Sequence, residues 1–187
     1  MKDLLNIFPF LHSGYKGQVY LHLGPANSGK SSSVEQYLSN RNPKLYYGTL
    51  LPSSNDRWEK IKIHRERRVG NAWFLLETTG DCEKDINDIF LFMEANEVPI
   101  HVMIDGVTSW CLSYDYSWDK AVCNARMIAE FLVNIVREQK SLSLHVLNTT
   151  YESDQLVSKM NKTINMILSS TFHEGLGGLS AYDHVDR

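Results

Sequence analysis

Cysteine is scarce in this chain, and the three cysteines present are scattered. Cys82, Cys111 and Cys123 form no C-x-x-C pair. A disulfide framework needs an even set of cysteines, and a structural zinc site needs paired thiolates. We therefore expect reduced thiols and a cytoplasmic protein.

Long apolar runs and an excess of positive charge are also missing. No stretch approaches the roughly 20 apolar residues of a membrane span, and the N-terminus lacks the basic, apolar and small-residue order of a signal peptide. The formal net charge of −3 gives no general attraction to nucleic acid or to an anionic membrane. These absences predict a soluble protein that binds neither.

The composition is that of an ordinary α/β domain, with 187 residues of which 43% are hydrophobic. Expected strands alternate with expected helices, which predicts a mostly parallel sheet flanked by helices. The strands are expected at 18–23, 44–49, 73–78, 100–105 and 142–147, and the helices at 31–38, 56–68, 85–96, 118–139 and 155–168.

Three parts of the chain are expected to differ in organisation. Residues 1–17 would form an N-terminal extension with a short helix, residues 18–172 a nucleotide-binding and transferase domain, and residues 173–187 a glycine-rich flexible tail.

The most informative motif is Gly24-Pro-Ala-Asn-Ser-Gly-Lys-Ser31, which has the pattern G-x-x-x-x-G-K-S between an expected strand and an expected helix. We expect Gly24 and Gly29 to turn successive N–H groups toward one anion at the positive end of the helix dipole. Lys30 would reach the β- and γ-phosphates, and the Ser31 hydroxyl would bind Mg²⁺. The alternative is a glycine-rich turn without a ligand. The pattern favours a site for GTP or ATP with Mg²⁺.

Asp105 is the expected second ligand of the metal ion. It ends the apolar run 102–105, which places its carboxylate at the carboxyl edge of the sheet, where P-loop proteins hold Mg²⁺. The alternative is an acidic residue that only caps the next turn.

His64 is a candidate nucleophile. It precedes Arg65, Arg67 and Arg68 in a highly charged segment. Imidazole attacks activated phosphorus and leaves again readily, so it suits a covalent nucleotidyl intermediate, and the arginines would stabilise the phosphate oxygens. Taken alone, a histidine on a charged helix is more often a solvated surface residue.

Five further segments follow the P-loop in an order found in a known family. They are Leu45-Tyr-Tyr-Gly-Thr49, Lys60-Ile-Lys-Ile-His64 with Arg68, Trp73 with Glu77, Asp105 with Thr108 and Trp110, and Leu147-Asn-Thr-Thr150 with the later Lys159-Met-Asn-Lys162. In this order, residues 18–172 resemble the adenosylcobinamide kinase / adenosylcobinamide-phosphate guanylyltransferase family of cobalamin assembly.

The resemblance implies a P-loop NTPase fold of the RecA-like type, with three layers, and an assembly into trimers. It implies two reactions, which are phosphorylation of the aminopropanol hydroxyl of adenosylcobinamide and transfer of GMP from GTP onto the resulting phosphate. His64 would carry GMP covalently, with Lys30 as the second catalytic residue and Ser31 and Asp105 at the metal.

The residues expected at the nucleotide come from the P-loop and from the matching family positions. They are Gly24, Pro25, Ala26, Asn27, Ser28, Gly29, Lys30, Ser31, Ser32, Gly48, Thr49, Leu50, Arg65, Glu66, Arg67, Arg68, Glu77 and Asp105. Glu77 would read guanine, because a carboxylate accepts from both the N1–H and the N2–H₂ groups. The alternative for Glu77 is a strand-end residue that faces solvent.

The chain departs from the family pattern after the fifth strand. Thr149 stands where the family has glutamate, and the family's loop is largely missing between Tyr151 and Lys159. That region lies near the corrinoid in the family, so the acceptor is a corrinoid or another small molecule. Two alternatives therefore stay open: a P-loop kinase or nucleotidyltransferase with a different acceptor, and a regulatory nucleotide-binding module without transfer chemistry.

Overall fold

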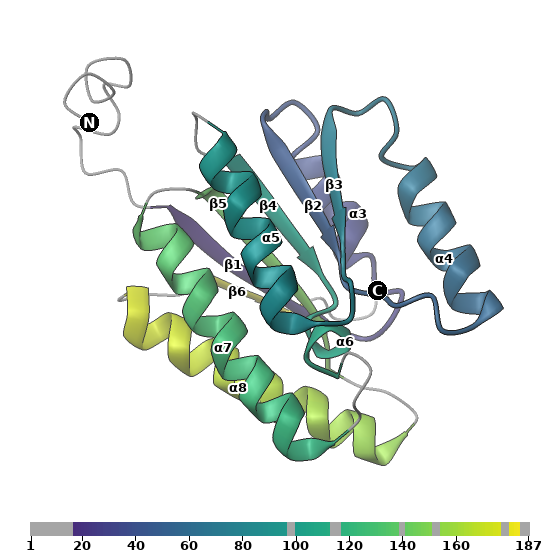
Figure 1. Ribbon diagram of the computed structural model, residues 1–187, viewed down its shortest axis with the longest axis vertical. Coiled ribbons are helices and arrows are strands. Elements are labelled where there is room, and N and C mark those ends of the chain that lie inside the picture. Colours follow the sequence, from purple (N-terminus) through teal and green to yellow (C-terminus); the bar gives the residue numbers. More distant parts are fainter. Residues whose placement is uncertain are drawn as a thin grey trace.

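The structure is a computed structural model, and it describes residues 17–96, 100–112, 117–138, 141–150, 154–176 and 180–183. In this part of the chain a central sheet has six strands in the order β3-β2-β4-β5-β1-β6, and every pairing is parallel (Figure 1). The strands are β1 (Gln18–Gly24), β2 (Lys44–Gly48), β3 (Trp73–Glu77), β4 (Ile100–Asp105), β5 (Ser141–Thr149) and β6 (Ser180–Asp183).

Helices cover both faces of the sheet, so the fold has the expected three layers. α5, α7 and α8 lie in front of the sheet in Figure 1, α3 lies behind it, and α4 stands to one side of β3. The described helices are α3 (Lys30–Tyr37), α4 (Asn55–Glu66), α5 (Cys82–Ala95), α6 (Val107–Leu112), α7 (Trp118–Arg137) and α8 (Gln155–Leu176).

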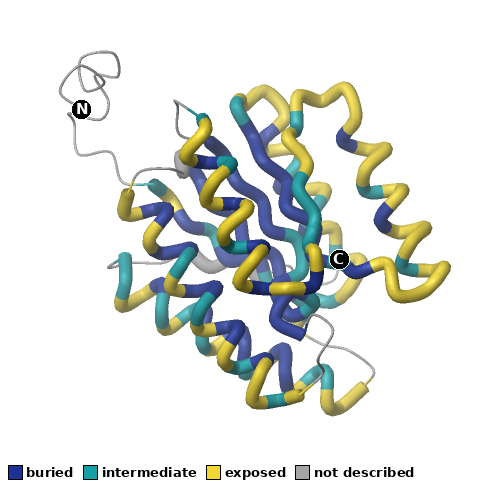
Figure 2. Tube along the Cα trace, in the orientation of Figure 1, coloured by how far each residue is buried: buried dark blue, intermediate teal, exposed yellow. Residues whose placement is uncertain are grey.

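Alternating side chains of the strands build two hydrophobic clusters, because successive residues of a strand face opposite sides. On one face Val102 and Ile104 pack in the large cluster with residues of α7 and α8 such as Leu132 and Leu168. On the other face Met103 belongs to a smaller cluster with Val34 of α3, with Leu38 just after that helix, and with Tyr46 and Leu147. Figure 2 shows the buried residues running along the strands and the inner sides of the helices.

The five expected strands and five expected helices are confirmed, with shifts of a few residues at their ends except for α8, which extends eight residues beyond the expected end at Leu168. The short helix α6 was not expected. The helix expected within residues 1–17 lies outside the described residues, apart from residue 17.

The prediction of an unstructured tail is wrong for two segments. α8 continues to Leu176, and Ser180–Asp183 forms β6 beside β1, with Tyr20 opposite Ser180. Gly175 reads as a helix stop in the sequence, but a Cβ at this position would lie 2.7 Å from Cγ1 of Val133. Glycine is therefore used here for the close approach of α8 to α7 and not to end the helix.

A buried polar network joins the end of β5 to α6 and α8. The side-chain amide of Asn148 donates to Thr108 Oγ1 at 2.9 Å and to Asn165 Oδ1 at 2.6 Å, and its oxygen accepts from the Thr108 N–H at 3.0 Å. Thr108 and Asn148, two of the residues that carried the family resemblance, therefore have a structural role, because they connect β5 to α6 and α8.

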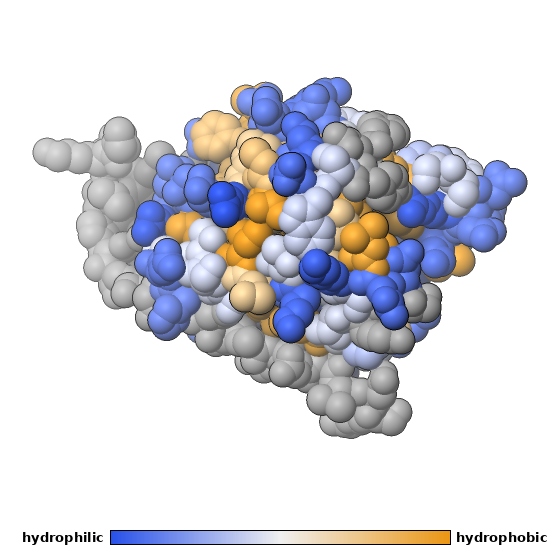
Figure 3. Space-filling view, turned by 90° about the horizontal axis from the view of Figure 1, so that it is seen from below, coloured by the Kyte–Doolittle hydropathy of each residue, from blue (hydrophilic) through white to orange (hydrophobic). Residues whose placement is uncertain are grey.

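No helix in the described ranges combines the length and the apolar character that a membrane crossing needs. Seen from below, the residues drawn in colour place their hydrophobic side chains in separate groups bordered by hydrophilic ones (Figure 3).

Candidate active site

The carboxyl ends of the parallel strands bring the expected site residues to one edge of the sheet. Gly48 lies opposite both Asp105 and Glu77 in the strand register, and Gly24 lies opposite Thr149. Ligands of open parallel α/β sheets bind at this edge, so the register alone places the expected phosphate, metal and base-binding residues side by side.

The P-loop residues connect β1 to α3 in the manner that an anion nest requires. Gly29, with φ 84°, is the N-cap of α3, and Asn27 also has a left-handed backbone, with φ 62°. Left-handed residues turn successive N–H groups toward one point. The expectation for Gly24 is wrong: its φ is not positive, because it is the last residue of β1 and pairs with Thr149. Asn27 takes the left-handed conformation instead.

The ammonium group of Lys30 lies over the loop. Nζ donates to the carbonyls of Gly24 at 2.9 Å and Pro25 at 2.5 Å, and to Ser28 Oγ at 3.3 Å. These contacts keep the charge beside the anion nest, where phosphate oxygens would replace the carbonyls as partners.

The two expected metal ligands lie in contact. Ser31 Oγ donates to Asp105, with distances of 3.1 Å to Oδ2 and 3.3 Å to Oδ1. Burial alone would raise the pKa of Asp105, but the hydrogen bond and charge of His64, the Arg68 guanidinium and the Ser31 hydroxyl together lower it. An ionised carboxylate beside a hydroxyl is the donor set that Mg²⁺ prefers, so the residues present fit the metal.

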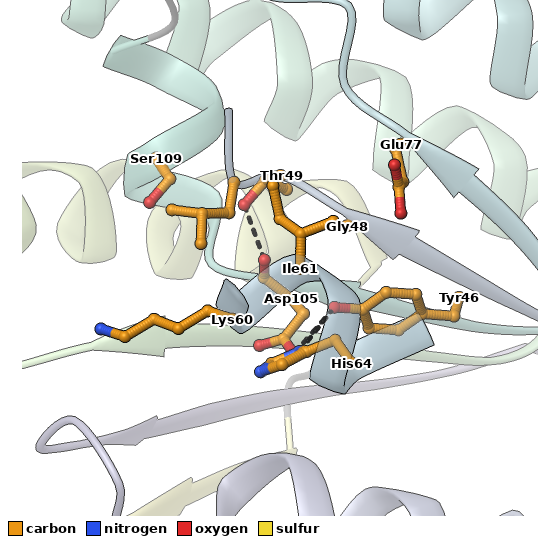
Figure 4. Close-up of a pocket in the computed structure, with 10 residues that line it drawn as sticks. Tyr46, Gly48, Thr49, Lys60, Ile61, His64, Glu77, Asp105 and Ser109 are labelled. Atoms are coloured by element: carbon orange, nitrogen blue, oxygen red, sulfur yellow. Dashed lines mark hydrogen bonds and ion pairs between the residues drawn. The ribbon is translucent and has the colours of Figure 1, made fainter. Parts of the chain in front are cut away.

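His64 lies on the side of α4 that faces this edge (Figure 4). Its Nδ1 atom is 3.1 Å from the Tyr46 hydroxyl and 3.6 Å from Asp105 Oδ2, and its side chain is 36% exposed. The side chain is therefore held against the expected metal ligand, and part of its ring remains open to solvent.

Two cavities meet at His64 and Asp105, which line both of them. The phosphate-side cavity is lined further by residues 26–32, Arg67 and Thr149. The second cavity, of about 190 Å³, is lined further by Tyr46, Gly48, Thr49, Leu50, Lys60, Ile61, Glu77 and Ser109.

The arginines after His64 have separate positions. Arg67 lines the phosphate-side cavity and donates to Ser32 Oγ at 3.1 Å. Arg65 pairs with both carboxylate oxygens of Glu77, at 2.6 and 2.5 Å. Arg65 and the exposed Glu66 line neither cavity.

Arg68 lies behind the site, with a fully buried side chain. Its guanidinium pairs with Glu35, donates to the His64 carbonyl at 2.7 Å and lies 3.6 Å from the centre of the Tyr46 ring. The structure therefore does not bring Arg68 to either cavity, and its observed contacts support the backbone of His64.

Thr49 lines the second cavity and also makes structural contacts. Its hydroxyl lies 2.6 and 2.7 Å from the carbonyls of Asp105 and Gly106, to which it donates. It ties the end of β2 to the end of β4 at the wall of the second cavity.

Sequence reasoning missed Tyr46, Lys60, Ile61 and Ser109 among the cavity residues. Lys60, Ile61 and His64 share one face of α4 by their helical spacing, which could have indicated the first two. Tyr46 and Ser109 reach the cavity through tertiary contacts that carry no local signal.

The fold is a parallel sheet between two layers of helices, and an anion nest, a lysine, a serine and a carboxylate lie at the carboxyl edge of the sheet. Together they define a P-loop nucleotide-binding protein of the RecA-like type. The structure is similar to a solved structure of a helicase ATPase domain, with 10% sequence identity, a TM-score of 0.51, and coverage of 89% of this chain and 79% of that chain. At this identity the likeness shows the fold alone.

The family model for cobinamide kinase / cobinamide phosphate guanyltransferase matches residues 20–168. The chain belongs to this family and is a transferase, as the sequence predicted. No curated protein gives a significant match to the chain.

Proposed function

We propose that this protein phosphorylates adenosylcobinamide and transfers GMP from GTP onto the resulting phosphate through a GMP adduct on His64. The observation that supports this most directly is the place of His64 between two cavities, one lined by the P-loop and the other by Glu77. A nucleophile in this place can meet a phosphate that the P-loop presents.

The roles proposed for the other residues follow from their chemistry. Lys30 and the N–H groups of the P-loop bind the triphosphate, and Mg²⁺ held by Ser31 and Asp105 would offset its charge. Arg67 lies on the phosphate side, where a guanidinium can bind phosphate oxygens.

We assign guanine recognition to Glu77. Its carboxylate is paired with Arg65, whose two parallel N–H donors resemble the two donors of the guanine edge. Guanine binding would therefore replace Arg65 at Glu77. Adenine presents an unprotonated N1 to this carboxylate, a mismatch that costs on the order of 1–3 kcal/mol, so GTP is preferred for nucleotidyl transfer.

A covalent adduct is the direct test. The protein is incubated with Mg²⁺ and GTP and its intact mass is measured, with His64→Asn as the variant and His173→Asn, an exposed histidine of α8, as the control. Wild type and the control gain the mass of GMP, whereas His64→Asn binds GTP but gains none. A GMP adduct on the His64→Asn variant would contradict the assignment.

Two other results would select the alternatives. Bound GTP without an adduct or turnover indicates a nucleotide-binding module. Phosphorylation of a compound other than adenosylcobinamide indicates a kinase with a different acceptor, which the shortened segment after Thr149 keeps open.

The setting of the proposed activity is the cytoplasm, where GTP, ATP and Mg²⁺ are available. Free thiols at Cys82, Cys111 and Cys123 are consistent with it. We also propose the trimer that the family resemblance implies, which light scattering of the purified protein would test.

A further inference from the structure

Tyr46 contacts both residues that the two cavities share. It ends no strand and belongs to no sequence motif for phosphate binding, yet its hydroxyl oxygen lies 3.1 Å from His64 Nδ1 and 3.3 Å from Asp105 Oδ2 (Figure 4). The residue is only 6% exposed, so water does not compete freely for these contacts.

The hydrogen atoms of this cluster have one consistent arrangement. The Tyr46 hydroxyl has one hydrogen to donate, and its oxygen lies within hydrogen-bonding distance of both Asp105 Oδ2 and His64 Nδ1. The carboxylate of Asp105 offers only acceptor atoms. Tyr46 therefore donates to Asp105, and its oxygen is left to accept from His64.

The same arrangement places the hydrogen of the His64 ring on Nδ1. This atom faces two acceptors, the Tyr46 oxygen at 3.1 Å and Asp105 Oδ2 at 3.6 Å. A neutral imidazole that carries its hydrogen on Nδ1 has its lone pair on Nε2.

We propose that Tyr46 is a positioning residue for guanylyl transfer, which fixes His64 in the tautomer and orientation in which Nε2 attacks the nucleotide. The inference rests on the proposed GMP adduct of His64. It adds a residue whose hydroxyl acts through His64 and not on the nucleotide.

The transfer chemistry needs this tautomer and no proton movement at His64. The Nε2 lone pair forms a bond to the α-phosphorus of GTP while the bond from that phosphorus to the bridging oxygen breaks, and pyrophosphate leaves with the electron pair. The ring then carries a positive charge and keeps its Nδ1 hydrogen beside Asp105. Attack by a phosphate oxygen of the acceptor breaks the N–P bond and returns the electron pair to Nε2.

Arg68 contacts both Tyr46 and His64 and so fixes their relative position. Its guanidinium lies 3.6 Å from the centre of the Tyr46 ring, and Nη1 donates to the His64 carbonyl at 2.7 Å. The ring is thus fixed on one side by a buried cation and its hydroxyl by Asp105, so removal of the hydroxyl alone leaves the packing in place.

The test compares Tyr46→Phe with Tyr47→Phe. Tyr47 is the next residue of β2, is also buried and packs against Trp110 on the opposite face of the sheet. The rate of GMP adduct formation under single turnover, the Kd for GTP by calorimetry, and the ¹⁵N shifts of the His64 ring are measured for wild type and for both variants.

We expect Tyr46→Phe to slow adduct formation roughly 10- to 100-fold, the effect of losing a hydrogen bond to a group that becomes charged. The Kd for GTP should stay within about twofold of wild type, because the hydroxyl touches no nucleotide atom in the proposal. Wild type and Tyr47→Phe should show ¹⁵N shifts of an Nδ1–H tautomer, and Tyr46→Phe a mixture of tautomers.

Each contrary result identifies what fails. Equal adduct rates in wild type and Tyr46→Phe, or an Nε2–H tautomer in wild type, overturn the role of Tyr46 while the His64 adduct stands. An equal loss in both variants shows a merely structural effect and also overturns it. A wild-type protein that never forms the adduct overturns the proposed function, and the role of Tyr46 in attack falls with it.

Discussion

At the scale of single residues, the charge of Lys30 decides how well the P-loop holds a triphosphate. Lys30→Ala removes a cation that lies beside the anion nest. Loss of a charged hydrogen-bonding partner predicts GTP binding weaker by roughly 10- to 100-fold, measured by calorimetry. Lys62→Ala, an exposed lysine of α4, is the control and should bind as wild type does. Unchanged affinity of Lys30→Ala would refute the P-loop assignment.

At the same scale, we expect Glu77 to determine the preference for GTP over ATP. Glu77→Gln replaces one acceptor by a donor that would face the guanine donors, so GTP binding should weaken about tenfold or more, while ATP binding should change little. Calorimetric titration with each nucleotide measures both affinities. Glu83→Gln, at an exposed position of α5, serves as the control. If GTP keeps its advantage over ATP in Glu77→Gln, another group reads the base.

At the scale of secondary-structure elements, the contact between α7 and α8 gives a test of stability. Gly175→Ala would normally stabilise a helix by up to about 1 kcal/mol. Here the new Cβ would lie 2.7 and 2.9 Å from the two Cγ atoms of Val133, and such overpacking costs about 1–3 kcal/mol. We therefore expect a net loss of unfolding free energy, measured by urea denaturation.

The matched control for this prediction removes the clash from the other side. In a Val133→Ala background the same Gly175→Ala change should cost less or become stabilising, because both Cγ atoms are gone. An equal loss in both backgrounds would show that the close contact is not its cause.

The same elements show how far the sequence could predict the fold and the site. The P-loop and the alternation of strands and helices are local patterns, and they placed Lys30, Ser31 and Asp105 at one edge. β6 and the helical Gly175 could not be predicted, because a free edge of β1 and the approach of α7 decide them. The sequence predicts Arg68 at the phosphate, but the structure buries it behind the site, because sequence cannot show which side of a helix end a neighbouring helix and strand cover.

At the scale of the whole molecule, a buried chain of histidines links three strands and makes stability depend on pH. His101 Nδ1 is 2.7 Å from Ser143 Oγ, which is 3.1 Å from His145 Nε2, and His145 Nδ1 is 3.1 Å from His22 Nε2. Burial lowers the pKa of His145 to about 3, helped by nearby His22, His101 and Arg41. Burial also lowers the pKa of His101 to about 4.

These shifts fix the sign of the pH effect. The folded protein keeps both rings neutral, whereas the unfolded chain takes up protons near pH 6.5. The contribution of the two neutral rings to the free energy of unfolding is therefore fully present above about pH 6.5. It is lost as pH falls toward 4, by on the order of 1–2 kcal/mol per pH unit. Urea denaturation between pH 7.5 and 4.5 measures it. His145→Gln should flatten the slope and His173→Gln should not; a flat wild-type curve would contradict the prediction.

The weak attachment of α4 has a consequence for nucleotide binding. Ile61 is its only buried residue, and its remaining ties to the domain run through His64, Arg65 and the arginines after it. Such an element opens locally at a small free-energy cost. Guanine that replaces Arg65 at Glu77 would also remove one of the contacts that hold this helix to the domain. If Glu77 binds guanine as proposed, occupancy of its site and the position of His64 are thereby coupled, because both depend on how α4 is held against the domain.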